Sequence, residues 1–545
     1  MLGLMQHQPL LISNIIEFAA LYHADTEVVS RRVEGDIHRS NYLNIRNRAK
    51  QVARALDAMQ IAQSARVATL AWNGYRHFEL YYGVSGSGRV LHTLNPRLHP
   101  DQMAWIVNHA EDEVLCFDMS FLPLVQAIRA KLPTVKHFVA LCEADKLPAD
   151  AGIPNLLSYE AWIAAQQGSN DYDWPTFDEN LASSMCYTSG TTGNPKGVLY
   201  SHRSTLLHAM ASAASDSIGI HGRDTVLPVV PMFHVNAWGL PYLMPMVGAK
   251  VVFPGPALDG KSIYELFENE KVTFSAGVPT VWQMLLAHMD ANQLKLSTMR
   301  RTCIGGSACP PAMFDAFRDK YNVMVNHAWG MTEMSPLGTY GTLKGKHYAQ
   351  DAAAQRTVLL KQGRAVFGVE MKIESDEGIE QARDGKAFGN LLVKGPWIVR
   401  EYFKGEAGDI LDKDGYFATG DVATLDPDGY MQITDRSKDV IKSGGEWISS
   451  IDIENIAMAH PAVAMAACIG IAHPKWDERP ILCVVKKPDV DVTAADIIKF
   501  YDGKIAKWQI PDDVQFVATI PLGATGKIQK NKLREQFKTY VLPTL

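Results

Sequence analysis

The sequence lacks any block of lysine or arginine, and its formal net charge is only −6 over 545 residues. Proteins that bind nucleic acid usually concentrate basic residues on one face or in one run, so nucleic acid is not an expected partner. The seven cysteines are odd in number, scattered and without a C-x-x-C pair. This distribution argues against both a disulfide framework and a structural zinc site.

Long uninterrupted apolar runs are missing as well. The most apolar segment, Gly239 to Pro256, contains prolines, glycines and Lys250, so it predicts buried strands and turns rather than a transmembrane segment. The segment from Met1 to His23 has no basic residue before its apolar stretch and no small-residue cleavage pattern. It does not predict a secretory signal, and we expect a soluble, cytoplasmic protein.

A hydrophobic content of 47% over this length predicts two or more packed domains. Residues 42–59 and 75–88 have helical patterns, and residues 66–72 between them have the pattern of a strand. Because similar alternation continues, the expected fold is α/β, with a large N-terminal domain (1–435) of mixed or parallel sheets covered by helices. Its last part, from about 365 to 435, has short strands and acidic turns and predicts a β-rich subdomain.

The remaining residues, 436–545, predict a small α+β domain. Its expected helices lie at 450–460 and 494–508, and its expected strands at 463–472 and 479–487.

One glycine-rich stretch, "YTSGTTGNPKG" at 187–197, combines backbone freedom, hydroxyl groups and Lys196. These features suit a phosphate-binding loop. The spacing of the P-loop of nucleotide hydrolases, G-x-x-x-x-G-K-[ST], is not met, because a proline precedes the lysine and a glycine follows it. From composition alone, an ordinary surface turn remains equally compatible.

Four further segments accompany this stretch: "HAWGMTE" (327–333), "YFATGD" (416–421), "DRSKDVIKSGGEWIS" (435–449) and "GATGKIQK" (523–530). In order and spacing, the five segments resemble the signatures of the adenylate-forming superfamily, which includes acyl-CoA synthetases, luciferases and the adenylation domains of peptide synthetases. The resemblance covers essentially the whole chain. The segment "PMFHVNAW" (231–238) resembles the fatty acyl-CoA synthetase branch, particularly medium-chain and methylthiopropionate-type CoA ligases.

The resemblance implies a reaction in two steps. A carboxylate attacks the α-phosphorus of ATP and releases pyrophosphate, and the acyl-adenylate then passes its acyl group to coenzyme A and releases AMP. The first step brings two anions together, so cations and positioning should supply most of the catalysis. Mg²⁺ prefers carboxylate and phosphate oxygens, and the resemblance gives its site to Glu333 and Thr188. The residues with implied catalytic roles are Lys527, Glu333, Thr332 and His234.

In the same way, the resemblance implies that the ATP and AMP contacts come from most of the signature segments. Asp421 is expected to accept both ribose hydroxyl groups, as a carboxylate can. The full set is Thr188, Ser189, Gly190, Thr191, Thr192, Gly193, Lys196, Ser307, Ala308, His327, Ala328, Trp329, Gly330, Thr332, Asp421, Arg436, Lys438 and Lys442.

The acyl group is expected to enter past an aromatic gate, Trp238. This residue and His234 lie four positions apart and would share one face if the segment were helical; a histidine in an apolar segment can also be a satisfied core residue. The implied acyl pocket and gate comprise His234, Val235, Trp238, Gly306, Gly330 and Met331. The implied loop for the coenzyme A step comprises Lys442, Gly444, Gly445, Glu446 and Trp447, and the implied hinge is Asp435.

The resulting hypothesis is an ATP-dependent acid:CoA ligase for an apolar carboxylate, in which the C-terminal domain swings between the two half-reactions. Two alternatives remain: a ligase that loads a separate carrier protein, and a non-catalytic sensor of acyl nucleotides. The expected partners are a carboxylic acid, ATP and coenzyme A. The resemblance also implies a homodimer and leaves peripheral membrane contact open.

Overall fold

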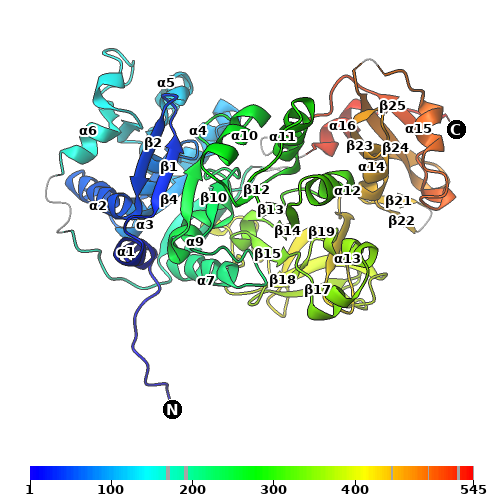
Figure 1. Ribbon diagram of the computed structural model, residues 1–545, viewed down its shortest axis with the longest axis horizontal. Helices are drawn as coiled ribbons and strands as arrows, with labels where there is room; N and C mark the ends of the chain where they lie inside the picture. The colour runs from blue at the N-terminus through cyan, green and yellow to red at the C-terminus, as the bar shows by residue number, and fades with distance from the viewer. Residues whose placement is uncertain (167–171, 189–193, 444–445, 489, 524–527, 544–545) are drawn as a thin grey trace.

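The structure is a computed structural model that describes residues 1–166, 172–188, 194–443, 446–488, 490–523 and 528–543. It is an α/β protein with a large N-terminal domain built on sheets and a small C-terminal domain. Figure 1 shows the N-terminal elements at one end of an elongated molecule and the C-terminal domain at the other. The predicted fold class is confirmed.

Within the described residues, one large sheet has the strand order β7-β6-β5-β3-β4-β8-β9, parallel except for the edge strand β9. Strand β3 matches the strand predicted at 66–72. The bounds are β3 Arg66–Leu70, β4 Val90–Thr93, β5 Asp112–Phe117, β6 His137–Ala140, β7 Leu157–Ser158, β8 Ala182–Tyr187 and β9 Gly197–Ser201.

The second large sheet has the order β16-β15-β14-β13-β12-β10-β11-β1-β2, with parallel pairing from β14 to β1 and antiparallel strands at both edges. The bounds are β1 Glu27–Arg31, β2 Ile37–Asn41, β10 Thr225–Pro228, β11 Lys250–Phe253, β12 Phe274–Gly277, β13 Arg301–Ile304, β14 Met324–Gly330, β15 Leu337–Tyr340 and β16 Arg364–Ala365.

The two sheets share an inner layer of helices, because the largest apolar core contains side chains from both sheets and from these helices. Helix α2 shows why the layer forms: its apolar residues recur at helical spacing and are buried, and the Asn41 side chain caps its first turn. The inner helices are α1 Ile12–Tyr22, α2 Tyr42–Ala58, α3 Tyr75–Gly86, α7 His202–Ala213 and α9 Leu240–Val247. Helices α2 and α3 confirm the helices predicted at 42–59 and 75–88.

Other helices cover the outer faces of the two sheets, where each sheet has its own apolar core. Those on the first sheet are α4 Pro100–Ala110 and α5 Leu122–Ile128, and those on the second are α10 Gly260–Asn269, α11 Pro279–Ala291 and α12 Pro311–Asp315. The result is five alternating layers of helix and sheet. No helix among the described residues is long and apolar enough to cross a membrane.

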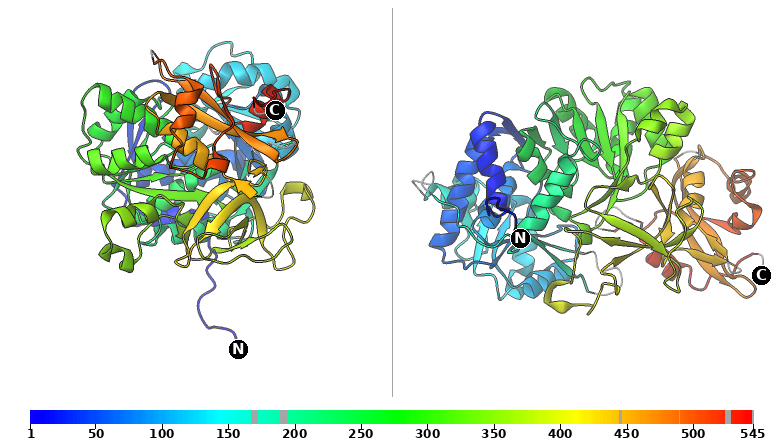
Figure 2. Two further views of the ribbon diagram at one scale, coloured as in Figure 1. Left: turned by 90° about the vertical axis from the view of Figure 1, so that its right-hand side faces the viewer. Right: turned by 90° about the horizontal axis from the view of Figure 1, so that it is seen from below.

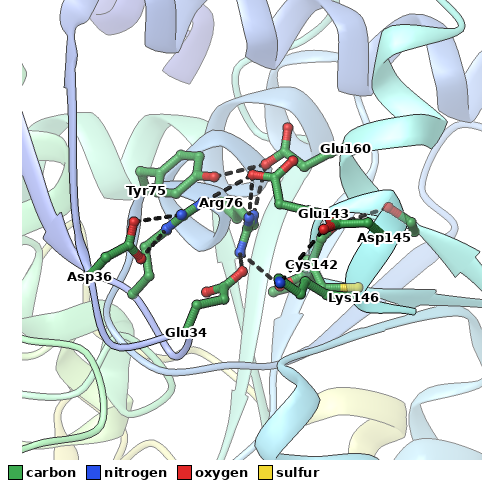
Figure 3. A network of polar contacts seen from close by, with 12 residues as sticks. Glu34, Asp36, Tyr75, Arg76, Cys142, Glu143, Asp145, Lys146 and Glu160 are labelled. Carbon is green, nitrogen blue, oxygen red and sulfur yellow. Dashed lines mark hydrogen bonds and ion pairs between the residues drawn. The ribbon is translucent and has the colours of Figure 1, made fainter. Parts of the chain in front are cut away.

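A network of charged side chains also joins the two large sheets. Arg76 on α3 pairs with Glu34, in the β1–β2 turn, at 2.8 Å and with Glu160, on α6 Tyr159–Ala164, at 2.8 Å. Glu143 receives a further contact from Arg76 at 3.2 Å and one from Arg32 at 3.0 Å. Figure 3 shows Glu34, Glu143 and Glu160 around the Arg76 side chain. The β1–β2 hairpin is thereby tied to the helices of the other sheet.

The segment 239–256 corrects one sequence prediction. We expected strands and turns, but its first half forms helix α9 and only Lys250–Phe253 is a strand. Pro245 lies inside the helix and has no N–H to donate to the carbonyl of Pro241. The hydroxyl of Tyr82, on α3, donates to that carbonyl instead at 2.6 Å. A hydroxyl from another helix therefore replaces the hydrogen bond that Pro245 cannot donate.

After the large sheets, the chain forms the four-stranded antiparallel sheet β17-β18-β19-β20, as predicted for 365–435. Figure 2 shows it, in yellow, between the large sheets and the C-terminal domain, in orange and red. The bounds are β17 Glu370–Glu374, β18 Phe388–Lys394, β19 Phe417–Leu425 and β20 Met431–Arg436, after helix α13 Ala352–Leu359.

In the C-terminal domain, helices cover both faces of a sheet with the order β22-β21-β24-β23, in which β25 also pairs with β24. The helix predicted at 494–508 is wrong in length. Helix α15 ends at Lys499, and turns follow, with Gly503 at a positive φ of 74°. The bounds are β21 Ile441–Ser443, β22 Glu446–Ile448, β23 Val463–His473, β24 Asp477–Lys486, β25 Asp513–Phe516, α14 Ser450–Met458, α15 Ala494–Lys499 and α16 Lys530–Gln536.

Candidate active site

A cavity of about 1250 Å³ lies where the large sheets, the four-stranded sheet and the C-terminal domain meet. Many of the residues singled out from the sequence line it, although they come from segments far apart in the chain. Those residues are Thr188, Lys196, His234, Val235, Trp238, Gly306, Ala328, Trp329, Gly330, Met331, Thr332, Glu333, Arg436 and Lys438.

Some predicted site residues lie elsewhere or outside the described residues. Ser307, Ala308, His327, Asp421, Asp435 and Lys442 are described but are not part of the cavity wall. Ser189, Gly190, Thr191, Thr192, Gly193, Gly444, Gly445 and Lys527 lie outside the described residues, and Glu446 and Trp447 are described for their backbone alone.

The base of the glycine-rich stretch is closed by two hydrogen bonds between Thr188 and Lys196. Strand β8 leads into Thr188, whose N–H donates to the Lys196 carbonyl at 2.9 Å, while the Lys196 N–H donates to Thr188 Oγ1 at 3.1 Å. The ammonium group of Lys196 lies 4.8 Å from the ring centre of Tyr402, within the range of a cation–π contact. Thr188 and Lys196 are therefore held on the same side of the cavity as Tyr402.

Glu333 lies in the short 3₁₀ turn Thr332–Met334 and is only 7% exposed. Its Oε1 accepts a hydrogen bond from the Tyr402 hydroxyl at 2.8 Å, and its backbone carbonyl accepts one from the N–H of Val399 at 2.8 Å. Tyr200 holds the preceding carbonyl, that of Thr332, at 2.6 Å. The turn that carries the carboxylate is thus held by contacts from β9 and from the segment between β18 and β19.

Sequence reasoning missed Tyr402. Burial, followed by the nearby Glu333 carboxylate, raises the pKa of this tyrosine, so its hydroxyl keeps its proton and donates. Its segment, "REYFKG", carries no pattern that would have marked it, because its partner lies 69 residues away in the chain.

The ribose candidate, Asp421 on β19, lies just behind the wall formed by Thr419 and Gly420. Trp329 Nε1 donates to Asp421 Oδ2 at 2.9 Å, and Arg436 Nε lies 3.7 Å from Oδ1. The carboxylate therefore has a fixed orientation. The ring of His327, by contrast, contacts backbone groups: Nε2 accepts from the Cys309 N–H at 3.3 Å, and Nδ1 contacts the Leu360 carbonyl at 3.2 Å.

The gate segment differs from the helix considered in the sequence analysis. Val235–Trp238 forms one turn whose four residues all have positive φ, so His234 and Trp238 do not share a face of a right-handed helix. The Trp238 ring lies against Gly305 and Gly306, where added β-carbons would come within 3.1 Å and 3.7 Å of it. Apolar residues that also line the cavity are Ile218, Cys303 and Leu337.

The junction to the C-terminal domain is buried. Asp435 is 1% exposed, and its two oxygens accept the N–H groups of Arg436 and Ser450 at 2.8 and 2.7 Å. Burial raises the pKa of Asp435. Lys530 also reaches this region and pairs with Glu454 at 2.7 Å. The residues on both sides of Lys527 line the cavity: Leu522, Gly523, Ile528, Gln529 and Lys530.

Comparison with known protein families identifies the class. The AMP-binding enzyme model matches residues 16–403, and the AMP-binding enzyme C-terminal domain model matches residues 452–527. The chain therefore belongs to the AMP-binding enzyme family, and the predicted resemblance is confirmed.

Individual relatives within and beyond this family model can be compared over the whole chain. The chain is 54% identical over 538 residues to 3-methylmercaptopropionyl-CoA ligase of Ruegeria lacuscaerulensis, with 99% of each chain covered. It is 50% identical over 542 residues to medium-chain-fatty-acid–CoA ligase of Ectopseudomonas oleovorans, covering 99% of this chain and 98% of the relative. Among solved structures, the anthranilate CoA ligase AuaEII in complex with anthranoyl-AMP matches with a TM-score of 0.86 and 26% identity, covering 98% of both chains.

Proposed function

We propose that this protein joins an apolar carboxylic acid to coenzyme A, using ATP and forming an acyl-adenylate on the way. The protein is an AMP-forming acid:CoA ligase, since relatives with this activity match its full length at 50–54% identity. One structural observation carries the proposal: a single cavity presents a buried carboxylate, a lysine of the glycine-rich stretch, an aromatic ring and buried apolar side chains.

In the adenylation step, a carboxylate oxygen of the acid attacks the α-phosphorus, and the bond from this phosphorus to pyrophosphate breaks. We infer that Lys196 and the glycine-rich stretch hold the leaving phosphates, that Thr332 contacts the α-phosphate and that Asp421 holds the ribose. Positive charge from Lys527 would offset the approach of the two anions.

Glu333 and Thr188 are the residues that would hold Mg²⁺. Their side chains offer only oxygen donors and line one cavity, which suits a hard cation. When bound, the ion would neutralise charge on the phosphates. The role of Tyr402 would be to orient the Glu333 carboxylate, and that of Lys196 to stay close to the same phosphates.

In the second step, the sulfur of coenzyme A attacks the acyl carbonyl carbon, and AMP leaves. We propose that 1–435 and 436–545 are the two domains, that Asp435 is the hinge and that the segment 442–447 turns toward the cavity for this step. The position of Asp435 supports this role: it lies near the end of β20, where the chain leaves the four-stranded sheet, and it accepts the N–H of Ser450 at the start of α14.

The acyl group is proposed to be a medium-chain or methylthio-substituted acid. Ile218, Cys303 and Leu337 are almost fully buried and give the inner end of the cavity an apolar wall. The two relatives described above act on acids of these kinds by name. We also propose a cytoplasmic homodimer as the working form.

The test measures ATP–pyrophosphate exchange and thioester formation with short, medium, long, aromatic and methylthio-substituted acids. We expect exchange that depends on the acid and a thioester once coenzyme A is added. Exchange without any thioester would favour a ligase that loads a carrier protein, and no exchange with any acid would favour a sensor.

Two glutamates provide a matched pair for the same assay. Each accepts a tyrosine hydroxyl, Glu333 from Tyr402 in the cavity wall and Glu370 from Tyr416 on the surface. We expect Glu333→Gln to lose exchange and Glu370→Gln to keep it. Equal activity of the two variants would contradict the proposed site.

A further inference from the structure

The turn that carries the gate has an unusual backbone. Val235, Asn236, Ala237 and Trp238 have φ values of 45°, 49°, 46° and 59°, so four consecutive residues with side chains lie in the left-handed region. Each is disfavoured there because its β-carbon lies close to the following carbonyl oxygen, and the β-branched Val235 is the least suited. Contacts from the surrounding structure must hold such a turn in place.

Asn236 makes those contacts. Its side chain is 5% exposed and points away from the cavity, into the layer between the two large sheets. Its Nδ2 donates to Ser184 Oγ on β8 at 3.0 Å. Its Oδ1 accepts from the Tyr81 hydroxyl on α3 at 3.3 Å and from the Cys186 thiol at 3.6 Å. The turn comes after β10 of the second large sheet, and these contacts attach it to β8 of the first.

The segment before the turn is anchored to the same place. Asn73, two residues before α3, donates from Nδ2 to the carbonyls of Pro228 and Val230 at 2.8 Å each, and its Oδ1 accepts the Met232 N–H at 2.6 Å. Asn236 is the corresponding anchor inside the turn.

The anchored turn determines which side chains face the cavity. His234, Val235 and Trp238 line the cavity, whereas Asn236 and Ala237 are buried behind them. If the turn relaxed to a right-handed one, the directions of His234 and Trp238 would change together, and the Trp238 ring would leave Gly305 and Gly306.

We propose that Asn236 is a positioning residue for the acyl gate: its buried amide holds the left-handed turn and thereby sets where His234 and Trp238 stand relative to the acid. This inference rests on the proposed ligase function of the cavity. Asn236 touches no substrate in this scheme, and it acts through the two residues on either side of it.

The experiment compares Asn236→Ala and Asn236→Gly by exchange kinetics with acids of increasing chain length. Both variants lose the amide, but glycine adopts positive φ without penalty and alanine does not. We expect Asn236→Ala to lower kcat/KM for the acid about tenfold, the usual effect of an unmatched buried hydrogen bond, and to flatten the preference among chain lengths. Asn236→Gly should keep more of the wild-type kcat/KM and more of the chain-length preference than Asn236→Ala does. In both variants, KM for ATP should stay within about twofold of wild type.

Two further variants separate positioning from folding. Ser184→Ala removes the acceptor of the Asn236 amide, so it should shift the chain-length preference in the same direction and add little when combined with Asn236→Ala. Asn326 is also buried and donates to a backbone carbonyl, that of Gly341, at 2.8 Å, but it lies on β14 away from the turn. Asn326→Ala should lower the melting temperature without changing the chain-length preference.

The proposal is overturned if Asn236→Ala keeps the wild-type chain-length preference, or if KM for ATP rises as much as KM for the acid. It is also overturned if the alanine and glycine variants behave alike in a folded protein. If the wild type itself shows no exchange that depends on an acid, the proposed function fails instead, and the two failures remain distinct.

Discussion

At the scale of single residues, the hydroxyl of Tyr402 connects two groups of opposite charge. It donates to Glu333, while the ring beneath it faces the ammonium group of Lys196. The variant Tyr402→Phe keeps the ring and removes only the donor. A hydrogen bond to a charged group contributes about 1.5–3 kcal/mol, so the concentration of Mg²⁺ that half-saturates ATP binding should rise about tenfold. Equilibrium binding of a fluorescent ATP analogue at varied Mg²⁺ measures this directly.

Tyr416 provides the control for that variant. Its hydroxyl also donates to a carboxylate, that of Glu370, at 2.9 Å, and its ring also faces a lysine, Lys372, at 4.4 Å. It does not line the cavity. Tyr416→Phe should leave the Mg²⁺ dependence unchanged, and an equal shift in both variants would contradict a specific role for Tyr402.

Asp118 gives a prediction about pH. Burial raises the pKa of this carboxyl group to about 7, although its Oδ2 accepts the Trp72 N–H at 2.7 Å. In the unfolded chain it ionises near pH 4, so between these values unfolding releases a proton and wild-type stability falls as pH rises, by about 1.4 kcal/mol per pH unit. Above pH 7 the Asp118 carboxyl group is ionised in both the folded and the unfolded chain, so the loss of stability no longer grows with pH.

Asp118→Asn replaces the carboxyl group by an amide that does not titrate, so it removes this pH-dependent loss of stability. We expect the melting temperature of the variant, relative to wild type, to rise from pH 5 to pH 7 and then to level off. Asp36→Asn is the control, because Arg32 lowers the pKa of Asp36. The Asp36 carboxylate stabilises the fold fully at any pH above its pKa in the unfolded chain, near 4. The difference in melting temperature between Asp36→Asn and wild type should therefore not change from pH 5 to pH 8. A flat difference for Asp118→Asn would refute the assigned protonation.

At the scale of elements, helix α9 depends on a donor from α3. Tyr82→Phe would leave the Pro241 carbonyl without the hydroxyl that reaches it at 2.6 Å. An unsatisfied buried carbonyl costs about 1–3 kcal/mol, which should appear as a lower melting temperature. Adding Pro245→Ala restores an N–H four residues after Pro241 and should recover part of the loss. If the double variant is no more stable than Tyr82→Phe, the explanation is wrong.

The same helix shows where prediction from sequence reaches its limit. Periodicity was sufficient for α2 and α3, whose apolar residues are buried by neighbours within their own layer. It failed for α9, because the proline pattern indicates a break and the compensating hydroxyl lies 159 residues away. The left-handed turn was equally hidden, since "VNAW" contains no glycine to suggest positive φ.

For the candidate site, the five signature segments contribute about half of the cavity wall. The residues that support the wall were not predictable in this way. Tyr402 and Asn236 act through contacts with distant segments, and ordinary tyrosine and asparagine residues carry no local pattern. Only the packing of the fold brings them to Glu333 and Ser184.

At the scale of the whole molecule, the C-terminal domain contributes to the wall of the same cavity as the large sheets. The residues flanking Lys527 line the same cavity as Glu333. We predict that Lys527→Ala lowers ATP–pyrophosphate exchange about a hundredfold or more, the usual effect of losing a group that stabilises transition-state charge. Thioester formation from a supplied acyl-adenylate and coenzyme A should continue, because that step no longer joins two anions.

Lys538→Ala is the control for this charge change. Lys538 lies in the same domain and is exposed, and its ammonium group lies 3.8 Å from the Glu535 carboxylate. It should keep both half-reactions. Loss of both half-reactions in Lys527→Ala would mean that the lysine supports the domain rather than the first step.

The burial of all seven cysteines has a consequence for the fate of the acyl-adenylate. Cys303 is part of the cavity wall, yet burial raises the pKa of its thiol to about 12. The nucleophilic form of a cysteine is the thiolate, so this side chain stays inert beside an activated acyl group. We therefore expect the Cys303 thiol not to compete with coenzyme A for an acyl group bound in this cavity. Incubation with ATP and acid alone should leave the intact mass of the protein unchanged.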